Sequence, residues 1–219
     1  SSDLAHIWPQ FVQSIWETIY MTFWSSLIDG ILGLGIGILL VITQEGGIAE
    51  DGYVYSLVDK VVNLLRSIPF IILLAVMFPI TNFIVHTTVG TTAALVPLVV
   101  GIFPFYARQV QNALLEIDPQ VIEAARSMGS GNLEIIFRIY LREGLPDLIR
   151  ASIVTVISLI GLTTMAGAIG SGGLGDVAIS IGYARYQNDV TVAAMLVILI
   201  MVFIVQFAGD WLAKKTVHL

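Results

Sequence analysis

The side chains that could do chemistry at a defined spacing lie mainly in one polar segment, residues 107–150. At its centre Glu123, Ala124 and Ala125 are adjacent, and Arg126 follows them. Two adjacent alanines give a helix a low surface that another protein can approach closely. A carboxylate and a guanidinium beside that surface supply polar anchoring. The pattern favours a helix that docks on a partner protein over a catalytic site.

The residues around this triplet are those that begin and end a short helix. Asp118 suits an N-cap, Pro119 suits the first helical position, and Gly129 suits the left-handed residue after the last turn. Ser130 is a second candidate cap. Apolar residues then recur at helical spacing, which predicts a second short amphipathic helix: Leu133, Ile136, Phe137 and Tyr140. We expect a helical hairpin, and a solvated loop is the alternative.

Other chemistry is poorly supported. The chain has no cysteine, and its histidines, His6, His86 and His218, lie far apart. Disulfides, thiol nucleophiles and zinc sites are therefore not expected. The sequence contains no Gly-x4-Gly-Lys-Ser/Thr phosphate loop, so it should not hydrolyse ATP itself. Because no nucleophile, base and orienting group come together, an enzyme is the weakest interpretation, and we expect no catalytic residue, cofactor or metal in this chain.

The amino-acid composition indicates whether water or lipid surrounds these helices. Of 219 residues, 57% are hydrophobic and 12% charged, and the mean hydropathy is +0.90. A soluble domain carries about 25% charged residues. We therefore predict an integral membrane protein. The formal charge of −6 and the pI near 4.9 argue against nucleic-acid binding, which needs a basic surface.

The gaps between charges predict the membrane spans. A hydrocarbon core of about 30 Å needs roughly 20 helical residues. Three uncharged or nearly uncharged stretches hold one span each, and a fourth, from Ser67 to Ala107, is long enough for two spans joined by a short hairpin. The sequence thus predicts an all-α membrane protein with five transmembrane helices, at about 18–43, 62–82, 89–107, 149–169 and 190–211.

The placement of lysine and arginine predicts the orientation. With the N-terminus outside, nine of the ten cations lie in the inside segments, and only Arg185 lies outside. Residues 1–17 then form an outer interfacial segment without a cleavable signal, residues 14–212 the membrane domain, and residues 213–219 a cytoplasmic tail. The inside loop 44–59 is acidic and expected to be solvated, with a partner contact as the alternative.

Two glycine groups and a few weakly polar residues belong to the spans. Gly33 and Gly37 form a small-xxx-small pair, which allows another helix to approach closely. A glycine run after the fourth span, from Gly167 to Gly175, predicts a tight turn. The fourth span contains mildly polar and flexible side chains that suit the wall of a path through the membrane, and packing or bonding to the helix backbone is the alternative for each of them. These residues are Ser158, Thr163, Thr164 and Met165.

The 107–150 segment resembles a known signature. Glu123-Ala124-Ala125, Gly129, Ile139 and Leu141 have the spacing of the EAA motif of type I permease subunits of bacterial ATP-binding-cassette importers. Arg142 stands where the family pattern has proline. Further segments, one of them at the start of the same region, are similar to the permeases of methionine importers, and these are 66–74, 112–117, 168–175 and 206–210.

The resemblance implies a role for each part. The region 118–142 would be the coupling helix and its hairpin, with Glu123, Ala124, Ala125, Met128 and Gly129 meeting the ATPase. Implied partners are a second copy of the chain, two ATPase subunits that bind ATP and Mg, an extracytoplasmic methionine-binding lipoprotein, and the lipid bilayer of a bacterial plasma membrane. Implied substrates are L-methionine, D-methionine and derivatives.

Two rival functions belong to other classes. An ion-coupled secondary carrier or channel would work without an ATPase, but such carriers usually place ionisable groups within their spans. Away from the ends of the predicted spans, where Arg66, Arg150 and Asp210 lie, the only charged residue in them is Asp29, in the first span. A membrane scaffold without transport activity would explain the docking hairpin but not its EAA spacing.

Overall fold

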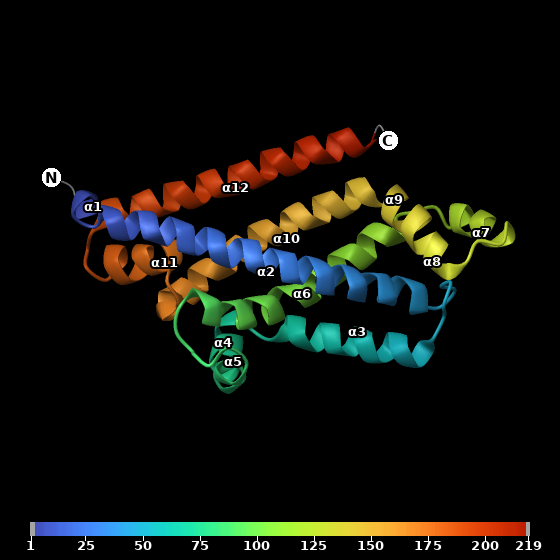
Figure 1. Cartoon of the computed structure of the whole chain (residues 1–219), viewed down its shortest axis with the longest axis horizontal. Coiled ribbons are helices and arrows are strands. Elements are labelled where there is room, and N and C mark those ends of the chain that lie inside the picture. Colours follow the sequence, from blue (N-terminus) through green and yellow to red (C-terminus); the bar gives the residue numbers. More distant parts are fainter. Residues whose placement is uncertain (1–2, 218–219) are drawn as a thin grey trace. The chain divides into compact units, whose positions relative to one another are not determined.

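The computed structural model describes residues 3–217, and every regular element in that range is helical (Figure 1). This confirms the predicted all-helical class. Residues 1–2 of the predicted N-terminal segment and 218–219 of the predicted tail lie outside the described residues. The elements, with π-helices labelled η, are α1 (Asp3–His6), α2 (Trp8–Thr43), α3 (Gly52–Ser67), α4 (Phe70–Val76), α5 (Phe78–Val85), α6 (Thr91–Leu115), α7 (Pro119–Ser127), α8 (Asn132–Ile135), η1 (Ile136–Tyr140), α9 (Leu141–Glu143), α10 (Leu145–Ala166), η2 (Gly167–Ser171), α11 (Gly173–Asp176), η3 (Val177–Tyr183) and α12 (Asn188–Val217).

Four helical stretches within residues 3–217 are long and apolar enough to cross a bilayer. A rise of about 1.5 Å per residue makes each of them longer than the hydrocarbon core. They overlap the predicted spans 18–43, 89–107, 149–169 and 190–211, and each helix continues past at least one predicted end. These stretches are Trp8–Thr43, Thr91–Leu115, Leu145–Ser171 and Asn188–Val217.

The range 62–82, expected to be a single span, is divided in the structure. Helix α3 ends at Ser67, and Pro69 has extended backbone, with φ −58° and ψ 133°. Proline has no N–H to donate and disfavours helical backbone in the residue before it. A second break at Met77 separates α4 from α5. This apolar stretch therefore runs as short helices.

The short hairpin predicted between the spans 62–82 and 89–107 is present as a turn after α5. The helix α5 ends at Val85, and the chain reverses through residues 86–90. His86 ends the helix in the left-handed region, with φ 60°, and Gly90 has φ 90°. A histidine at positive φ is uncommon, because the Cβ atom crowds the backbone there.

The chain forms two compact units. In the described part, the first unit contains residues 3–28, 68–102 and 156–206, and the second contains 29–67, 103–155 and 207–217. Helices α2, α6, α10 and α12 each contribute residues to both. The candidate pathway residues belong to the first unit, and the predicted coupling hairpin belongs to the second.

The first unit has a core beside the glycine-rich segment. Phe11 of α2 packs with Leu174, Val177 and other buried side chains of α11, η3 and α12. The hydroxyl oxygen of Thr18 accepts a hydrogen bond from the backbone N–H of Leu174 at 2.8 Å. Gly173 has φ 85°, and an added Cβ would lie 2.8 Å from Thr18 Oγ1. The tight turn predicted from the glycine run is present, and this glycine is required for it.

The second unit shows why the small-residue pair occurs in α2. A Cβ added at Gly33 would lie 2.6 Å from the ring of Tyr106, and one at Gly37 would lie 2.6 Å from Val110. Both partners are on α6. Gly35, on another face of the helix, has open space. The predicted close helix approach is confirmed, and it brings α2 against the part of α6 that leads into the hairpin.

Candidate coupling site

Helix α7 has the ends that its sequence predicts. Asp118 precedes it, and its Oδ1 accepts a hydrogen bond from the Gln120 N–H at 2.9 Å. Pro119 occupies the first turn. Gly129 has φ 85°, and the N–H of Ser130 donates to the Ala125 carbonyl at 3.1 Å. These bonds satisfy backbone groups that a helix end leaves unpaired, so α7 is a defined two-turn unit.

The second predicted helix differs from the expectation in two respects. Gly131, not Ser130, is its N-cap residue, with no side-chain cap bond. The chain then passes through α8, the π-helix η1 and α9. A π-helical turn adds a residue to the turn and shifts the buried face. Ile135 and Tyr140 are therefore buried, while Leu133 and Phe137, expected on the same face, are 71% and 64% exposed.

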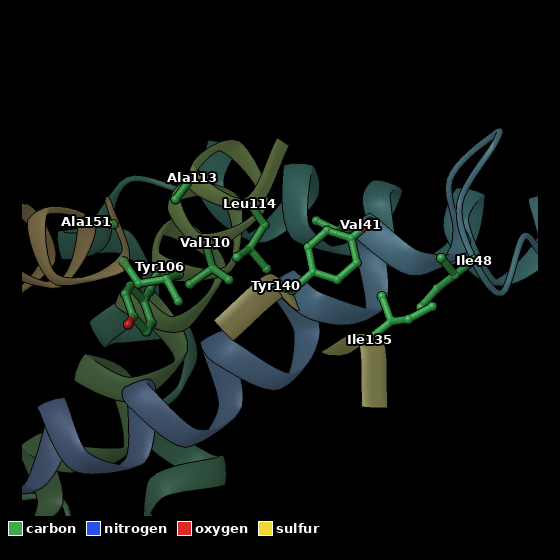
Figure 2. Packing of buried hydrophobic residues seen from close by; sticks show 10 residues of the cluster. Val41, Ile48, Tyr106, Val110, Ala113, Leu114, Ile135, Tyr140 and Ala151 are labelled. Atoms are coloured by element: carbon green, nitrogen blue, oxygen red, sulfur yellow. The ribbon is translucent and has the colours of Figure 1, made fainter. Parts of the chain in front are cut away.

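The hairpin is fixed to the rest of its unit by a buried apolar cluster. Figure 2 shows the Tyr140 ring beside Val41 of α2 and Leu114 of α6, with Ile135 close to Ile48. Tyr106, Val110 and Ala113 of α6 and Leu148 and Ala151 of α10 complete the cluster. Burial of this apolar area joins the hairpin to the ends of three long helices.

Ile48 corrects one prediction, that of a solvated loop at 44–59. Its side chain is only 8% exposed and belongs to the same cluster as Ile135 and Tyr140. The loop is also held by its backbone, because the Ala49 N–H donates to the Ile42 carbonyl at 2.9 Å. Residues 52–67, part of which was expected to be loop, form the amphipathic helix α3. The loop therefore attaches the end of α2 to the hairpin.

Four of the five predicted ATPase-contact residues share an exposed surface, and Ala125 does not. Glu123, Ala124, Met128 and Gly129 are exposed, and Met128 retains 86% of its accessible surface. Ala125 is partly buried and packs against the cluster. Helix α7 thus places Ala125 toward the core and Glu123 and Ala124 outward. Leu133 and Phe137 add exposed apolar side chains to the hairpin, which favours a partner surface.

A cavity of about 290 Å³ lies beside this surface. Its walls include the loop residues Glu45 and Ile48 and the α7 residues Glu123 and Arg126, with Tyr140 at the hairpin. Burial raises the pKa of the Tyr140 hydroxyl, and the positive charge of Arg126 partly opposes that rise. The cavity gives α7 room on the side that faces loop 44–48.

A second charged cluster holds α3 against α6. Arg108 lies 2.7 Å from the Asp59 carboxylate and donates to the Asn63 side-chain oxygen at 2.7 Å. It also donates to Gln111 Oε1 at 2.6 Å. The arginine is 16% exposed. Charge-assisted hydrogen bonds from one guanidinium to three side chains fix geometry as well as adding stability. Nothing in the sequence alone predicts that Arg108 contacts Asp59, Asn63 and Gln111.

The predicted pathway residues are all in α10, in the first unit, but they differ in environment. Thr163 is buried and donates to the Ile160 carbonyl at 2.6 Å, and Thr164 donates to the Gly161 carbonyl at 2.6 Å. Their hydroxyls thus bond to their own helix. Ser158 is partly buried, and Met165 is 47% exposed. The helix places Ser158 and Met165 two turns apart.

The described residues contain no group of three or more histidine, aspartate or glutamate side chains placed to hold a metal ion. What the fold and the site define together is a multi-helix membrane protein with an exposed, capped docking helix. Residues 31–218 match the family described as the binding-protein-dependent transport system inner membrane component. The chain belongs to this family.

Individual permease proteins of known name are similar to this chain over nearly its whole length. The chain is 43% identical over 212 residues to the probable D-methionine transport system permease protein MetI of Pasteurella multocida, covering 97% of this chain and 98% of the relative. It is 47% identical over 208 residues to the methionine import system permease protein MetP of Bacillus subtilis, covering 95% and 92%.

Solved structures agree with the fold. A chain of the MetNI methionine ABC transporter, in inward-facing conformations, has a TM-score of 0.95 and 42% identity, covering 99% of both chains. A chain of an amino acid ABC transporter solved with histidines has a TM-score of 0.79 at 15% identity and shows the shared fold alone, covering 97% of this chain and 96% of the other. The predicted type I importer permease fold is confirmed.

Proposed function

We propose that this chain is the permease subunit of an ATP-driven methionine importer, working through the exposed surface of α7. The observation that carries the proposal is the packing of that helix. Its inner face joins the cluster that contains Val41 of α2, Val110 of α6 and Ala151 of α10. A displacement of α7 is therefore passed to three long helices of the same unit, since a close-packed core does not deform continuously.

The partners follow from this surface and from the relatives. Each chain carries a single coupling segment, at 118–142, and a homodimer would present two of them to a pair of ATPase subunits. ATP and Mg would bind to those subunits and not to this chain. An extracytoplasmic methionine-binding lipoprotein would deliver L-methionine, and D-methionine or derivatives. The names of the P. multocida and B. subtilis relatives support this substrate.

We place the chain in a bacterial plasma membrane with the N-terminus outside and the C-terminus inside. The distribution of cations supports this orientation, because α7–α9 and the end of α12 are rich in arginine and lysine. ATP binding would draw the two α7 helices together and open the pathway outward, and hydrolysis would reverse the change. Along α10, Ser158, Thr163, Thr164 and Met165 would give the pathway a weakly polar, uncharged wall.

Reconstitution tests this function. The chain is placed in proteoliposomes with its partner ATPase and binding protein, and uptake of labelled methionine is followed with internal ATP. We expect uptake that requires ATP and both partners and that persists when proton and sodium gradients are dissipated. Uptake by the chain alone, driven by an ion gradient, would identify a secondary carrier instead.

A further inference from the structure

A cavity in the first unit has no role in the coupling surface described above. It has a volume of about 360 Å³ and lies among α4, α5, the first turns of α6, and residues 169–171. Ligand pockets of this size fall in the lower part of the range for small molecules. We call it the hydroxyl-lined cavity, after Thr81, Thr88 and Ser171 on its walls.

The chemistry of the walls excludes some ligands. None of the residues lining this cavity is charged, and most are aliphatic or aromatic, such as Leu74, Phe78 and Ala94. A ligand with a charged side chain would lose its hydration there without a counter-charge. The walls therefore suit a small molecule with an apolar side chain and a few groups that bond to hydroxyls.

The hydroxyl of Thr81 is the strongest sign that the cavity takes a ligand. Thr81 is only 5% exposed, yet among residues 3–217 its side chain has no hydrogen-bond partner. Thr43 and Thr155, which are also buried, donate to a carbonyl of their own helix at 2.6 Å and 2.8 Å, whereas the buried Thr22 hydroxyl of α2 is likewise without a partner. Thr81 lines the cavity without that bond, so its hydroxyl is free for a ligand.

The other two hydroxyls belong to irregular backbone. In the described part of the chain, Thr88 and Ser171 also lack a side-chain hydrogen bond. Thr88 lies in the turn between His86 and Gly90, both at positive φ. Ser171 follows a kink at Ile169 and Gly170, where the backbone leaves helical geometry and Gly170 has φ 102°. Residues in sparsely populated backbone conformations, such as His86 at positive φ, cluster at functional sites.

We propose that the hydroxyl-lined cavity is a selectivity site that holds a small neutral amino acid during transport, with the apolar side chain against Leu74 and Ala94 and the polar groups at Thr81, Thr88 and Ser171. This rests on the proposed function, which supplies the transported amino acid. Recognition in the permease is then by shape and hydroxyl bonding. Every amino acid brings an α-ammonium and an α-carboxylate, which the three hydroxyls would have to hold. A charged side chain is rejected because it adds a further charge that finds no partner.

Protection from a thiol reagent tests occupancy directly. The chain has no cysteine, so Ser171→Cys introduces a single thiol. In the assembled transporter we expect methionine to slow labelling of this thiol at least threefold, and glutamate to leave the rate unchanged. Phe83→Cys is the control: Phe83 is 83% exposed, is not part of the cavity wall, and should label at one rate throughout.

Transport by two variants tests the role. Ala94→Phe fills the floor of the cavity and should lower methionine uptake at least tenfold while ATP hydrolysis continues. Thr81→Val keeps the size of the side chain and should raise the KM for methionine several-fold, as loss of one hydrogen bond does. Thr87→Val should leave the KM unchanged, because the Thr87 hydroxyl already bonds within the turn, to Val89.

The outcomes separate the two proposals. Wild-type protein that takes up no methionine with ATP contradicts the proposed function, whereas labelling of Ser171→Cys still reports on the cavity. Wild-type uptake together with methionine-insensitive labelling overturns the selectivity site. Normal uptake by Ala94→Phe also overturns it. Protection that follows the lipid composition and not the amino acid would identify the cavity as a lipid site.

Discussion

The coupling surface and the hydroxyl-lined cavity are built on different principles. Helix α7 has charged ends, side-chain and glycine caps, and a buried face that joins a close-packed cluster. The cavity has no charged lining residue and is bounded by a broken helix, a turn at positive φ and a kink at Ile169 and Gly170. A site that meets one protein partner benefits from rigidity and charge. A site that a small molecule must leave benefits from weak, uncharged contacts.

The largest expected effect is at the coupling surface. Gly129→Asp places a carboxylate where we expect the ATPase to pack, and burying an unpaired charge in an interface costs several kcal/mol. ATP-dependent uptake should fall by about 100-fold or more, since about 1.4 kcal/mol corresponds to a factor of ten. Uptake by proteoliposomes, normalised to folded protein, measures it.

A matched variant separates charge from backbone strain. Gly129 has φ 85° and open space for a side chain. Asparagine tolerates this left-handed conformation and carries no charge, so Gly129→Asn should retain most of the uptake. Equal losses in both variants would show that the backbone, and not the interface, is what the aspartate disturbs.

The second effect concerns the attachment of loop 44–51 to the hairpin. Ile48→Ala removes a buried side chain from the cluster with Ile135 and Tyr140, a change that costs about 2–5 kcal/mol in protein cores. Because the contact joins α2 to the hairpin, uptake should fall several-fold while ATP hydrolysis continues. The ratio of methionine imported to ATP hydrolysed measures this uncoupling.

An exposed neighbour provides the control. Glu50→Ala changes the same loop at an exposed residue and should leave the ratio unchanged. An unchanged ratio in Ile48→Ala as well would mean that the loop does not transmit the displacement of α7.

A third effect tests the packing that supports the hairpin. Gly37→Leu has no space against Val110, and overpacking a core costs about 1–3 kcal/mol. Its Tm in detergent should fall by several degrees. Gly35→Leu adds the same side chain where nothing lies within 4 Å and should leave the Tm nearly unchanged. A similar Tm for the two variants would contradict the close approach of α2 and α6.

The smallest expected effect is at a threonine whose hydroxyl bonds to its own helix, in contrast to Thr81, which lines the cavity. Thr163→Val removes a hydroxyl that donates to its own helix, to the Ile160 carbonyl. The Ile160 carbonyl keeps its backbone hydrogen-bond partner in α10. Methionine uptake and the KM for methionine should therefore change less than twofold. The several-fold change expected for Thr81→Val is the comparison. A larger effect at Thr163 would move the site of selectivity from the cavity toward α10.

The sequence was most informative where local rules decide the structure. Asp118, Pro119 and Gly129 predicted both ends of α7, because capping depends on neighbouring residues alone. The Gly33 and Gly37 pair predicted a close helix contact, although not that Tyr106 and Val110 would make it. Charge-poor stretches predicted five spans, and four of these coincide with helices in the described part of the chain that can cross a bilayer, whereas the range 62–82 is broken into short helices.

Features set by tertiary packing could not be predicted in this way. The π-helix η1 changes which residues of the hairpin are buried, so Leu133 and Phe137 were placed on the wrong face. Ile48 lies in an acidic loop and is buried only because Ile135 and Tyr140 come to it. Thr81 lies in a charge-free stretch, where nothing marks its hydroxyl as unpaired until the neighbouring helices are placed.

Crosslinking at α7 tests the central claim most directly, that a separate ATPase acts on this surface. Met128→Cys places a single thiol on a side chain that is 86% exposed, and Thr87→Cys places one in the turn after α5. With a short bifunctional reagent in membranes that contain the assembled transporter, Met128→Cys should crosslink to the ATPase subunit and Thr87→Cys should not. An intact complex in which Met128→Cys forms no such crosslink would contradict the account.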